Sequence, residues 1–123
     1  MADAKRVVVL GASPKPQRYA FKAVEMLTKH GHEAVPVNPA YDRISGLECF
    51  PDVSAVPGPV DTITVYLGKH RSGPLTENII EKAPRRLILN PGAENDDLAE
   101  AASKRGIEVV EGCTLVMLTI GTF

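Results

Sequence analysis

The chain has 123 residues, 44% of them hydrophobic and 24% charged, and a formal net charge of −1. This length suits one domain over residues 1–123 whose core needs neither a metal nor a disulfide, and the near-zero charge argues against a nucleic-acid partner. The two cysteines lack metal-ligand spacing. No apolar run is long enough for a membrane span, and the polar start is unlike a signal peptide. A cytoplasmic location without membrane contact is therefore expected.

The first predicted strand runs over 6–10 and is followed at once by a glycine. Its sequence, Arg-Val-Val-Val-Leu, is rich in β-branched residues, which is typical of a strand covered on both faces. Gly11 then opens a turn that leads into a helical pattern over 20–29. Because the free amides and the positive dipole end of a helix attract phosphate, this corner is a predicted ligand-binding turn.

The rest of the chain alternates between predicted strands and helices. Strands are predicted over 33–37, 61–67, 86–89 and 107–110, with a weaker one at 47–49; helices are predicted from Pro74 to Pro84, from the cap at Asn95 to Gly106, and over 114–120, with one helical turn at 52–55. This alternation predicts an α/β fold, a doubly wound and mainly parallel sheet of five or six strands with helices on both faces.

Ligands of such sheets bind beyond the carboxyl ends of the strands, where the strand order reverses. The segments expected to meet at that edge are 11–19, 37–40, 67–71, 90–94 and 112–113. A nicotinamide dinucleotide is the less favoured ligand, because Ser13 and Pro16 stand where the dinucleotide fingerprint has its second and third glycines. The second strand also ends in Asn38-Pro39 rather than in the acid that would bind a ribose.

Several blocks of the sequence, in order, resemble the small stand-alone CoA-binding domain proteins. The blocks are LGAS at 10–13, PxRY at 16–19, PVNP at 36–39, PVDT at 59–62, NPGAEN at 90–95 and GIEVVxxCT at 106–114. These proteins are Rossmann-like relatives of the CoA-binding domain of the succinyl-CoA synthetase α subunit. The resemblance implies that the chain binds coenzyme A or an acyl-CoA without catalysis of its own.

The resemblance also implies which residues surround this ligand. The first turn would wrap the diphosphate beside Arg18, and 38–40 would meet the adenosine half. The residues expected to bind the cofactor are Gly11, Ala12, Ser13, Pro14, Lys15, Pro16, Arg18, Tyr19, Asn38, Pro39, Ala40, Leu67, Leu89, Asn90, Pro91 and Gly92. Many relatives carry a lysine where this chain has Ala40, which leaves the preference between CoA and dephospho-CoA open; Arg43 and Lys69 are candidate substitutes.

No catalytic or metal-binding residue is predicted. His30 and His32 bracket Gly31 at a helix end away from the expected site, which indicates capping or surface roles. His70 lies at the expected ligand edge, but it has no partnered carboxylate or nucleophile in the sequence pattern. Cys113 follows a strand and precedes a helix, where a thiol can become reactive, so an acyl-transfer enzyme is an alternative beside the small NAD(P)-binding oxidoreductase. A structural or regulatory module with an empty site is a third class, and a protein partner or a homo-oligomer is compatible with the sequence.

Overall fold

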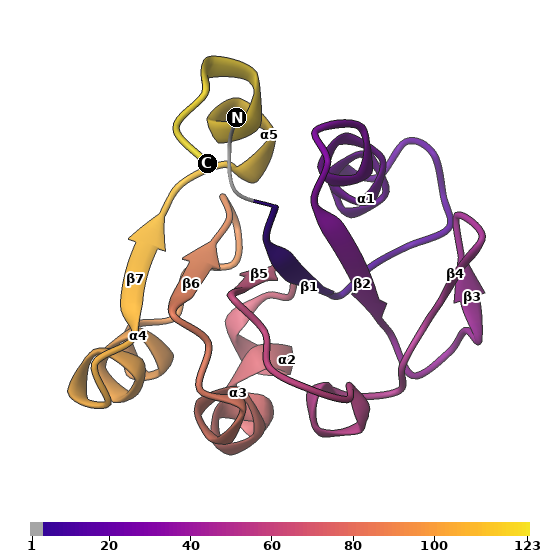
Figure 1. The fold of residues 1–123 in the computed structure, drawn as a ribbon. Coiled ribbons are helices and arrows are strands. Elements are labelled where there is room, and N and C mark those ends of the chain that lie inside the picture. The colour runs from indigo at the N-terminus through magenta and orange to yellow at the C-terminus, as the bar shows by residue number, and fades with distance from the viewer. Residues whose placement is uncertain (1–3) are drawn as a thin grey trace.

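The computed structural model describes residues 4–123, which form a parallel sheet with helices on both faces (Figure 1). The strands are β1 (Arg6–Leu10), β2 (Glu33–Val37), β5 (Thr62–Val65), β6 (Arg86–Leu89) and β7 (Glu108–Glu111). Their order is β2-β1-β5-β6-β7, and each neighbouring pair is parallel. The strand order therefore reverses between β1 and β5. The predicted doubly wound sheet is confirmed, with five strands.

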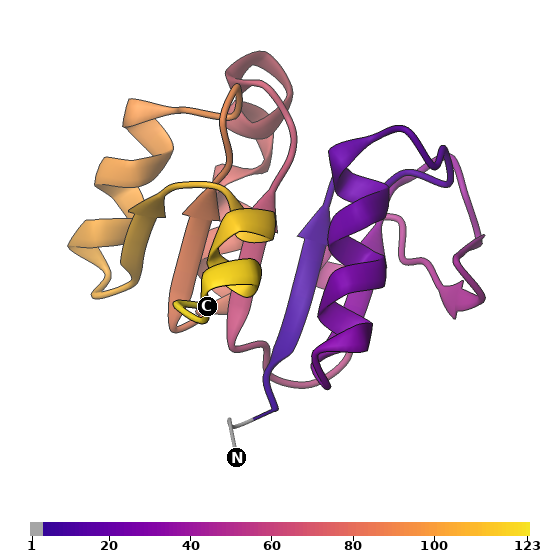
Figure 2. The same ribbon diagram turned by 90° about the horizontal axis from the view of Figure 1, so that it is seen from above.

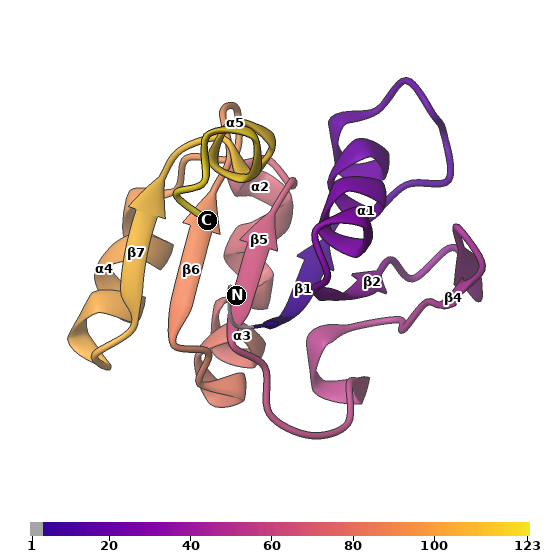
Figure 3. The ribbon, with the colours of Figure 1, turned by 45° about the horizontal axis from the view of Figure 1, so that its top comes forward.

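Strand β1 lies between β2 and β5, and its three consecutive valines have no exposed surface. Leu10, its last residue, pairs with Val37 at the end of β2 and with Val65 at the end of β5. The loops that follow these three strands consequently start at the same level. They meet at one edge of the sheet, and the longest projection there is the loop between β1 and the first helix (Figure 3).

Two helices cover each face of the sheet (Figures 1 and 2). They are α1 (Tyr19–Lys29) and α5 (Thr114–Ile120) on one face, and α3 (Thr76–Lys82) and α4 (Asp96–Lys104) on the other. Since side chains alternate along a strand, Val7 packs with Leu27 in the core beneath α1, and Val8 packs with Ile79 in the core beneath α3. The predicted end of the first helix is confirmed, because Gly31 follows it with a φ of +87°.

The segment between β2 and β5 contains a short hairpin, of which the sequence pattern predicted the second strand, at 47–49, but not the first. Its strands, β3 (Arg43–Ile44) and β4 (Leu47–Glu48), pair antiparallel over two residues each. The predicted helical turn near 52–55 is present as η1 (Val53–Ala55), where the Asp52 carboxylate accepts a hydrogen bond from the Ala55 amide at 2.9 Å. Arg43 donates a hydrogen bond to the Gly46 carbonyl within the hairpin.

The helical region after β5 begins earlier than the expected start at Pro74. The segment expected as a turn forms α2 (Lys69–Ser72), which continues through η2 (Gly73–Leu75) into α3. The Gly68 carbonyl accepts hydrogen bonds from the amides of Arg71 and Ser72, at 2.9 and 3.0 Å. Pro74 fits inside this region because it lies in the first turn of η2, where no amide donor is required.

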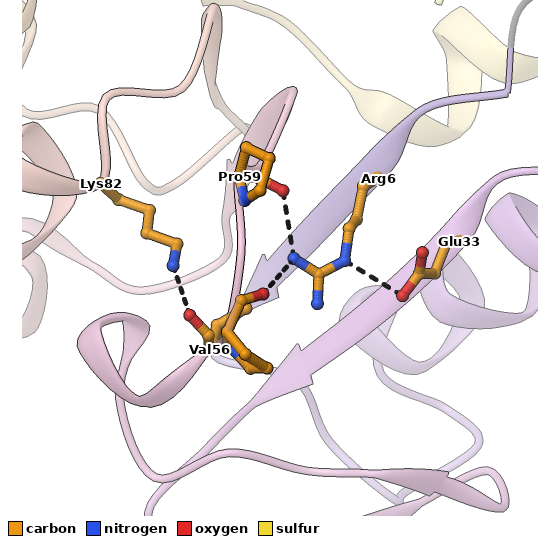
Figure 4. Close-up of polar contacts among 6 residues, drawn as sticks. Arg6, Glu33, Val56, Pro59 and Lys82 are labelled. Atoms are coloured by element: carbon orange, nitrogen blue, oxygen red, sulfur yellow. Dashed lines mark hydrogen bonds and ion pairs between the residues drawn. The ribbon is translucent and has the colours of Figure 1, made fainter.

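Arg6 connects the amino ends of the strands to the crossover that precedes β5 (Figure 4). Its Nη1 donates to the carbonyls of Pro57 and Pro59, at 2.6 and 3.1 Å, and its Nε donates to Glu33 on β2. Lys82 of α3 donates to the carbonyl of Val56 in the same crossover. These contacts hold the crossover against the sheet.

Within residues 4–123, no helix has the length and apolar character needed to cross a membrane.

Candidate functional site

A cleft of about 350 Å³ opens beyond the carboxyl ends of β1, β2 and β5. We call it the polar cleft. It is lined by Gly11, Ala12, Ser13, Lys15, Arg18, Tyr19, Ala20, Asn38, Tyr41, Tyr66, Leu67, Arg71 and Pro91. Segments that are far apart in the sequence therefore meet at the edge where the strand order reverses.

A smaller cleft of about 200 Å³ lies beside the polar cleft. We call it the apolar cleft, because most of its lining side chains are aliphatic or proline. It is lined by Leu10, Val37, Pro39, Pro51, Asp52, Val53, Leu67, Arg71, Leu75 and Asn78. Leu67 and Arg71 line both clefts, so the boundary between the two runs along these side chains.

The loop after β1 is held against the end of β2. The amides of Gly11 and Ala12 both donate to the Val37 carbonyl, at 3.0 and 3.3 Å. The Asn38 side chain donates back to the Ala12 carbonyl at 2.8 Å. The amides of Gly11 and Ala12 are consequently already bonded within the chain, and they shape the loop rather than offer donors to a ligand.

Free donors lie further along this loop, at the start of α1. The first helical residue is Tyr19, and Arg18 precedes it without a side-chain cap or an acid in the first turn. Within residues 4–123, the amides of Tyr19, Ala20 and Phe21 have no hydrogen-bond acceptor. Since these groups carry the positive end of the helix dipole, the polar cleft has the donor set of a phosphate site.

Two cations accompany these amides. Lys15 and Arg18 are exposed and line the polar cleft. Within residues 4–123 neither side chain forms an ion pair. The Ser13 hydroxyl accepts a hydrogen bond from the Lys15 amide at 3.1 Å, which tightens the turn that carries both cations. An anion at the start of α1 would therefore meet two positive charges.

Asn90 serves the framework of the site rather than its surface. It is only 2% exposed, and its Nδ2 donates to the Thr64 hydroxyl at 2.7 Å and to the Val65 carbonyl at 2.9 Å. Its Oδ1 accepts from the amide of Thr114 at 2.9 Å. One buried side chain thus joins the end of β5 to the start of α5.

The structure brings most of the predicted site residues to the two clefts. Those that line a cleft are Gly11, Ala12, Ser13, Lys15, Arg18, Tyr19, Asn38, Pro39, Leu67 and Pro91. Those that line neither are Pro14, Pro16, Ala40, Leu89, Asn90 and Gly92. Leu89 and Asn90 are buried in the fold, and the Ala40 amide donates to the Asn38 Oδ1.

Sequence reasoning missed four residues that line the polar cleft, Ala20, Tyr41, Tyr66 and Arg71. Arg71 stood in a segment expected at this edge, yet only the helical turn of α2 shows that it reaches the clefts. Tyr66 has a buried hydroxyl without a hydrogen-bond partner in residues 4–123. Burial raises the pKa of Tyr66 to about 12, so the phenol is neutral at physiological pH.

The histidines and Cys113 lie outside the two clefts. His32 accepts a hydrogen bond from the Lys5 amide and packs on Phe123 with ring centroids 5.1 Å apart, and burial lowers the pKa of its imidazole. Among residues 4–123 there is no group of three or more His, Cys, Asp or Glu side chains that could hold a metal ion.

A third cleft, of about 400 Å³, lies at the amino ends of the strands. We call it the opposite cleft. It is lined by Ala4, Lys5, Asp61, Arg85, Arg86 and Glu108, so charges of both signs are mixed there. Arg86 is held in place, because it donates to the Thr62 hydroxyl and the Phe123 carbonyl and its guanidinium carbon lies 4.3 Å from the centre of the Phe123 ring.

Comparison with known proteins finds relatives along nearly the whole chain. A family model described as a CoA binding domain matches residues 5–119. YneT, an uncharacterized protein of Bacillus subtilis (strain 168), is 24% identical over 106 residues, which are 86% of this chain and 78% of YneT. The crystal structure of another uncharacterized protein has 41% sequence identity and a TM-score of 0.93, and the match covers 99% of this chain and 100% of that chain.

The same fold occurs as a part of a larger enzyme. Ca. Korarchaeum cryptofilum dinucleotide forming acetyl-coenzyme A synthetase 1, solved in complex with phosphate and ADP, matches 88% of this chain with a TM-score of 0.76. The match covers 25% of that enzyme at 23% sequence identity. At this identity the likeness shows the fold.

Proposed function

Because this chain belongs to the CoA-binding domain family, we propose that it binds coenzyme A or an acyl-CoA at the carboxyl edge of its sheet. The observation that carries this proposal is the start of α1. Three amides there lack acceptors within residues 4–123, and Lys15 and Arg18 stand beside them in the polar cleft. Such a donor set suits the diphosphate of a nucleotide, since the charge of an anion complements both the helix dipole and the two cations.

The adenosine half of the ligand is proposed to lie toward β2. In doubly wound sheets the end of the second strand contacts the ribose of a nucleotide that spans the switch point. Here that end supplies Val37 and Pro39 to the apolar cleft, whose volume of about 200 Å³ suits a purine base. The diphosphate would then occupy the polar cleft, and the pantetheine arm would leave past Pro91.

Binding without catalysis by this chain alone is the favoured form of the proposal. An acyl-transfer reaction at Cys113 is less favoured, because this thiol lines neither cleft. A nicotinamide dinucleotide is also less favoured, since the amides of Gly11 and Ala12 are bonded to Val37 and the second strand ends without an acid.

Ligand-dependent thermal unfolding tests this function. CoA and acetyl-CoA are expected to raise the midpoint temperature more than NAD⁺ or NADP⁺ do; a ligand at about 100 times its dissociation constant adds about 2.7 kcal/mol of stability. Arg18→Ala is expected to weaken CoA binding roughly tenfold, because hydrogen bonds to charged groups contribute about 1.5–3 kcal/mol. Arg105→Ala is the control, since Arg105 is an exposed cation at the end of α4 that lines neither cleft.

Stronger stabilisation by NAD⁺ than by every CoA compound would contradict the proposal, as would the absence of any response to CoA. Equal CoA affinity in Arg18→Ala and Arg105→Ala would remove Arg18 from the site.

A further inference from the structure

Arg71 lies at the boundary between the two clefts, and it is a cation that lines both of them. Its residue is exposed, and within residues 4–123 its side chain makes no hydrogen bond and no ion pair. Its backbone is fixed nonetheless, because its amide donates to the Gly68 carbonyl at 2.9 Å in α2. Within residues 4–123, the backbone of Arg71 is thus fixed beside the boundary that a ligand spanning both clefts would cross, and its guanidinium has no partner there.

The chemistry of coenzyme A puts a further phosphate near that point. Its adenosine carries a phosphate monoester on the ribose 3′ oxygen, between the adenine base and the diphosphate. With the base in the apolar cleft and the diphosphate in the polar cleft, the ribose lies at the boundary beside Leu67 and Arg71. A guanidinium can bind such a phosphate through two parallel N–H groups.

We propose that Arg71 binds the 3′-phosphate of coenzyme A and makes the site select CoA over dephospho-CoA. This inference rests on the proposed function and names a determinant of its specificity. Arg71 takes the place of the two cations, Arg43 and Lys69, that the sequence offered as partners of this phosphate. Arg43 donates to the Gly46 carbonyl inside its hairpin, and Lys69 lines neither cleft.

Within residues 4–123, Asp52 is the one carboxylate that lines the apolar cleft, and it does not oppose this role. Asp52 accepts hydrogen bonds from the Ser54 hydroxyl and from the Ala55 amide, at 2.5 and 2.9 Å, so it is engaged as the cap of η1. Lys15 and Arg18 line only the polar cleft, next to the start of α1, where they face the diphosphate. The 3′-phosphate is therefore left to Arg71.

Calorimetric titration of the whole protein with CoA and with dephospho-CoA tests this role. The wild type is expected to bind CoA at least about tenfold more tightly than dephospho-CoA. Arg71→Gln is expected to weaken CoA binding by about the same factor and to change dephospho-CoA binding less than about twofold. Lys69→Gln is the matched control, because it removes an exposed cation from the same short helix outside the clefts, and it should preserve both affinities.

The outcomes separate this inference from the proposed function. If Arg71→Gln weakens CoA and dephospho-CoA equally, or leaves CoA unchanged, CoA binding stands and the role of Arg71 is wrong. A selective loss of NADP⁺ binding relative to NAD⁺, with CoA unchanged, would assign Arg71 to a 2′-phosphate and also overturn the inference. If neither CoA compound binds the wild type, the proposed function itself fails.

Discussion

Asn90→Ala is expected to lower the free energy of unfolding by about 3 kcal/mol, because it removes a buried amide that joins two elements. Three hydrogen bonds are lost, to the Thr64 hydroxyl, the Val65 carbonyl and the Thr114 amide. The Thr114 amide is left without its acceptor in a position that water does not reach, which costs more than the loss of an exposed bond. Urea unfolding followed by circular dichroism measures this change.

Asn38→Ala is the matched control for that prediction. Its side chain also makes two bonds to the backbone, to the Ala12 carbonyl and from the Ala40 amide, but the residue is only half-buried. Water can replace these bonds, so a loss of about 1 kcal/mol is expected. A loss in Asn90→Ala no larger than that in Asn38→Ala would contradict the structural role given to Asn90.

Gly11→Ala is expected to lower the free energy of unfolding by about 2–3 kcal/mol, from backbone strain and a steric clash together. The φ of Gly11 is +89°, a conformation that residues with a Cβ rarely adopt. An added Cβ would also lie 2.8 Å from Cδ2 and 3.0 Å from Cγ of Leu67. Because Leu67 lines both clefts, its displacement is expected to weaken CoA binding as well, measurable by calorimetry.

Gly31→Ala separates these two causes. Gly31 has nearly the same φ, +87°, but no atom lies within 4 Å of an added Cβ. It therefore reports the backbone strain alone, about 1–2 kcal/mol, without an effect on CoA affinity. The double variant Gly11→Ala, Leu67→Ala should relieve the clash. The free energy of unfolding that Gly11→Ala removes in the Leu67→Ala background should then equal the amount that Gly31→Ala removes in the wild type. Identical losses in the two glycine variants would show that the contact with Leu67 has no energetic weight.

The sheet could be predicted because its strands carry strong local signals. The predicted ranges 33–37 and 86–89 agree with β2 and β6, and the helix predicted over 114–120 agrees with α5. The strands are rich in β-branched and aliphatic residues, and several helices have a start or end signal, such as the side chain of Asn95, which accepts from the Leu98 amide. Because the connections between parallel strands are right-handed and do not cross, the alternation of strands and helices along the chain allows few arrangements of the sheet.

The short elements could not be predicted in the same way. The strand β3 has two residues, which is too few for an alternating pattern, and β4 is one residue shorter than the strand predicted at 47–49. The helix α2 depends on hydrogen bonds to the Gly68 carbonyl, and Pro74 favoured a later start because proline is common at the first helical position.

The position of the two clefts followed from topology, but the hydrogen bonds of their residues did not. The sequence placed Gly11, Ala12 and Asn90 among the ligand contacts, whereas their hydrogen bonds to Val37, Thr64 and Thr114 depend on partners that are distant in the chain. Only the folded structure shows that these groups are already bonded. The free amides at the start of the first helix were expected from the sequence, because every helix begins with unbonded amides, whereas the position of Arg71 between the clefts depends on the three-dimensional arrangement.

The central claim is that the diphosphate of CoA binds at the start of α1, and titration of the ¹⁵N-labelled protein with CoA, followed by amide chemical shifts, tests it most directly. The largest shifts are expected on the amides of Ser13, Lys15, Arg18, Tyr19, Ala20, Leu67 and Arg71, which line the polar cleft. Largest shifts at Lys5, Arg85 and Glu108, around the opposite cleft, or no shifts at millimolar CoA, would contradict it.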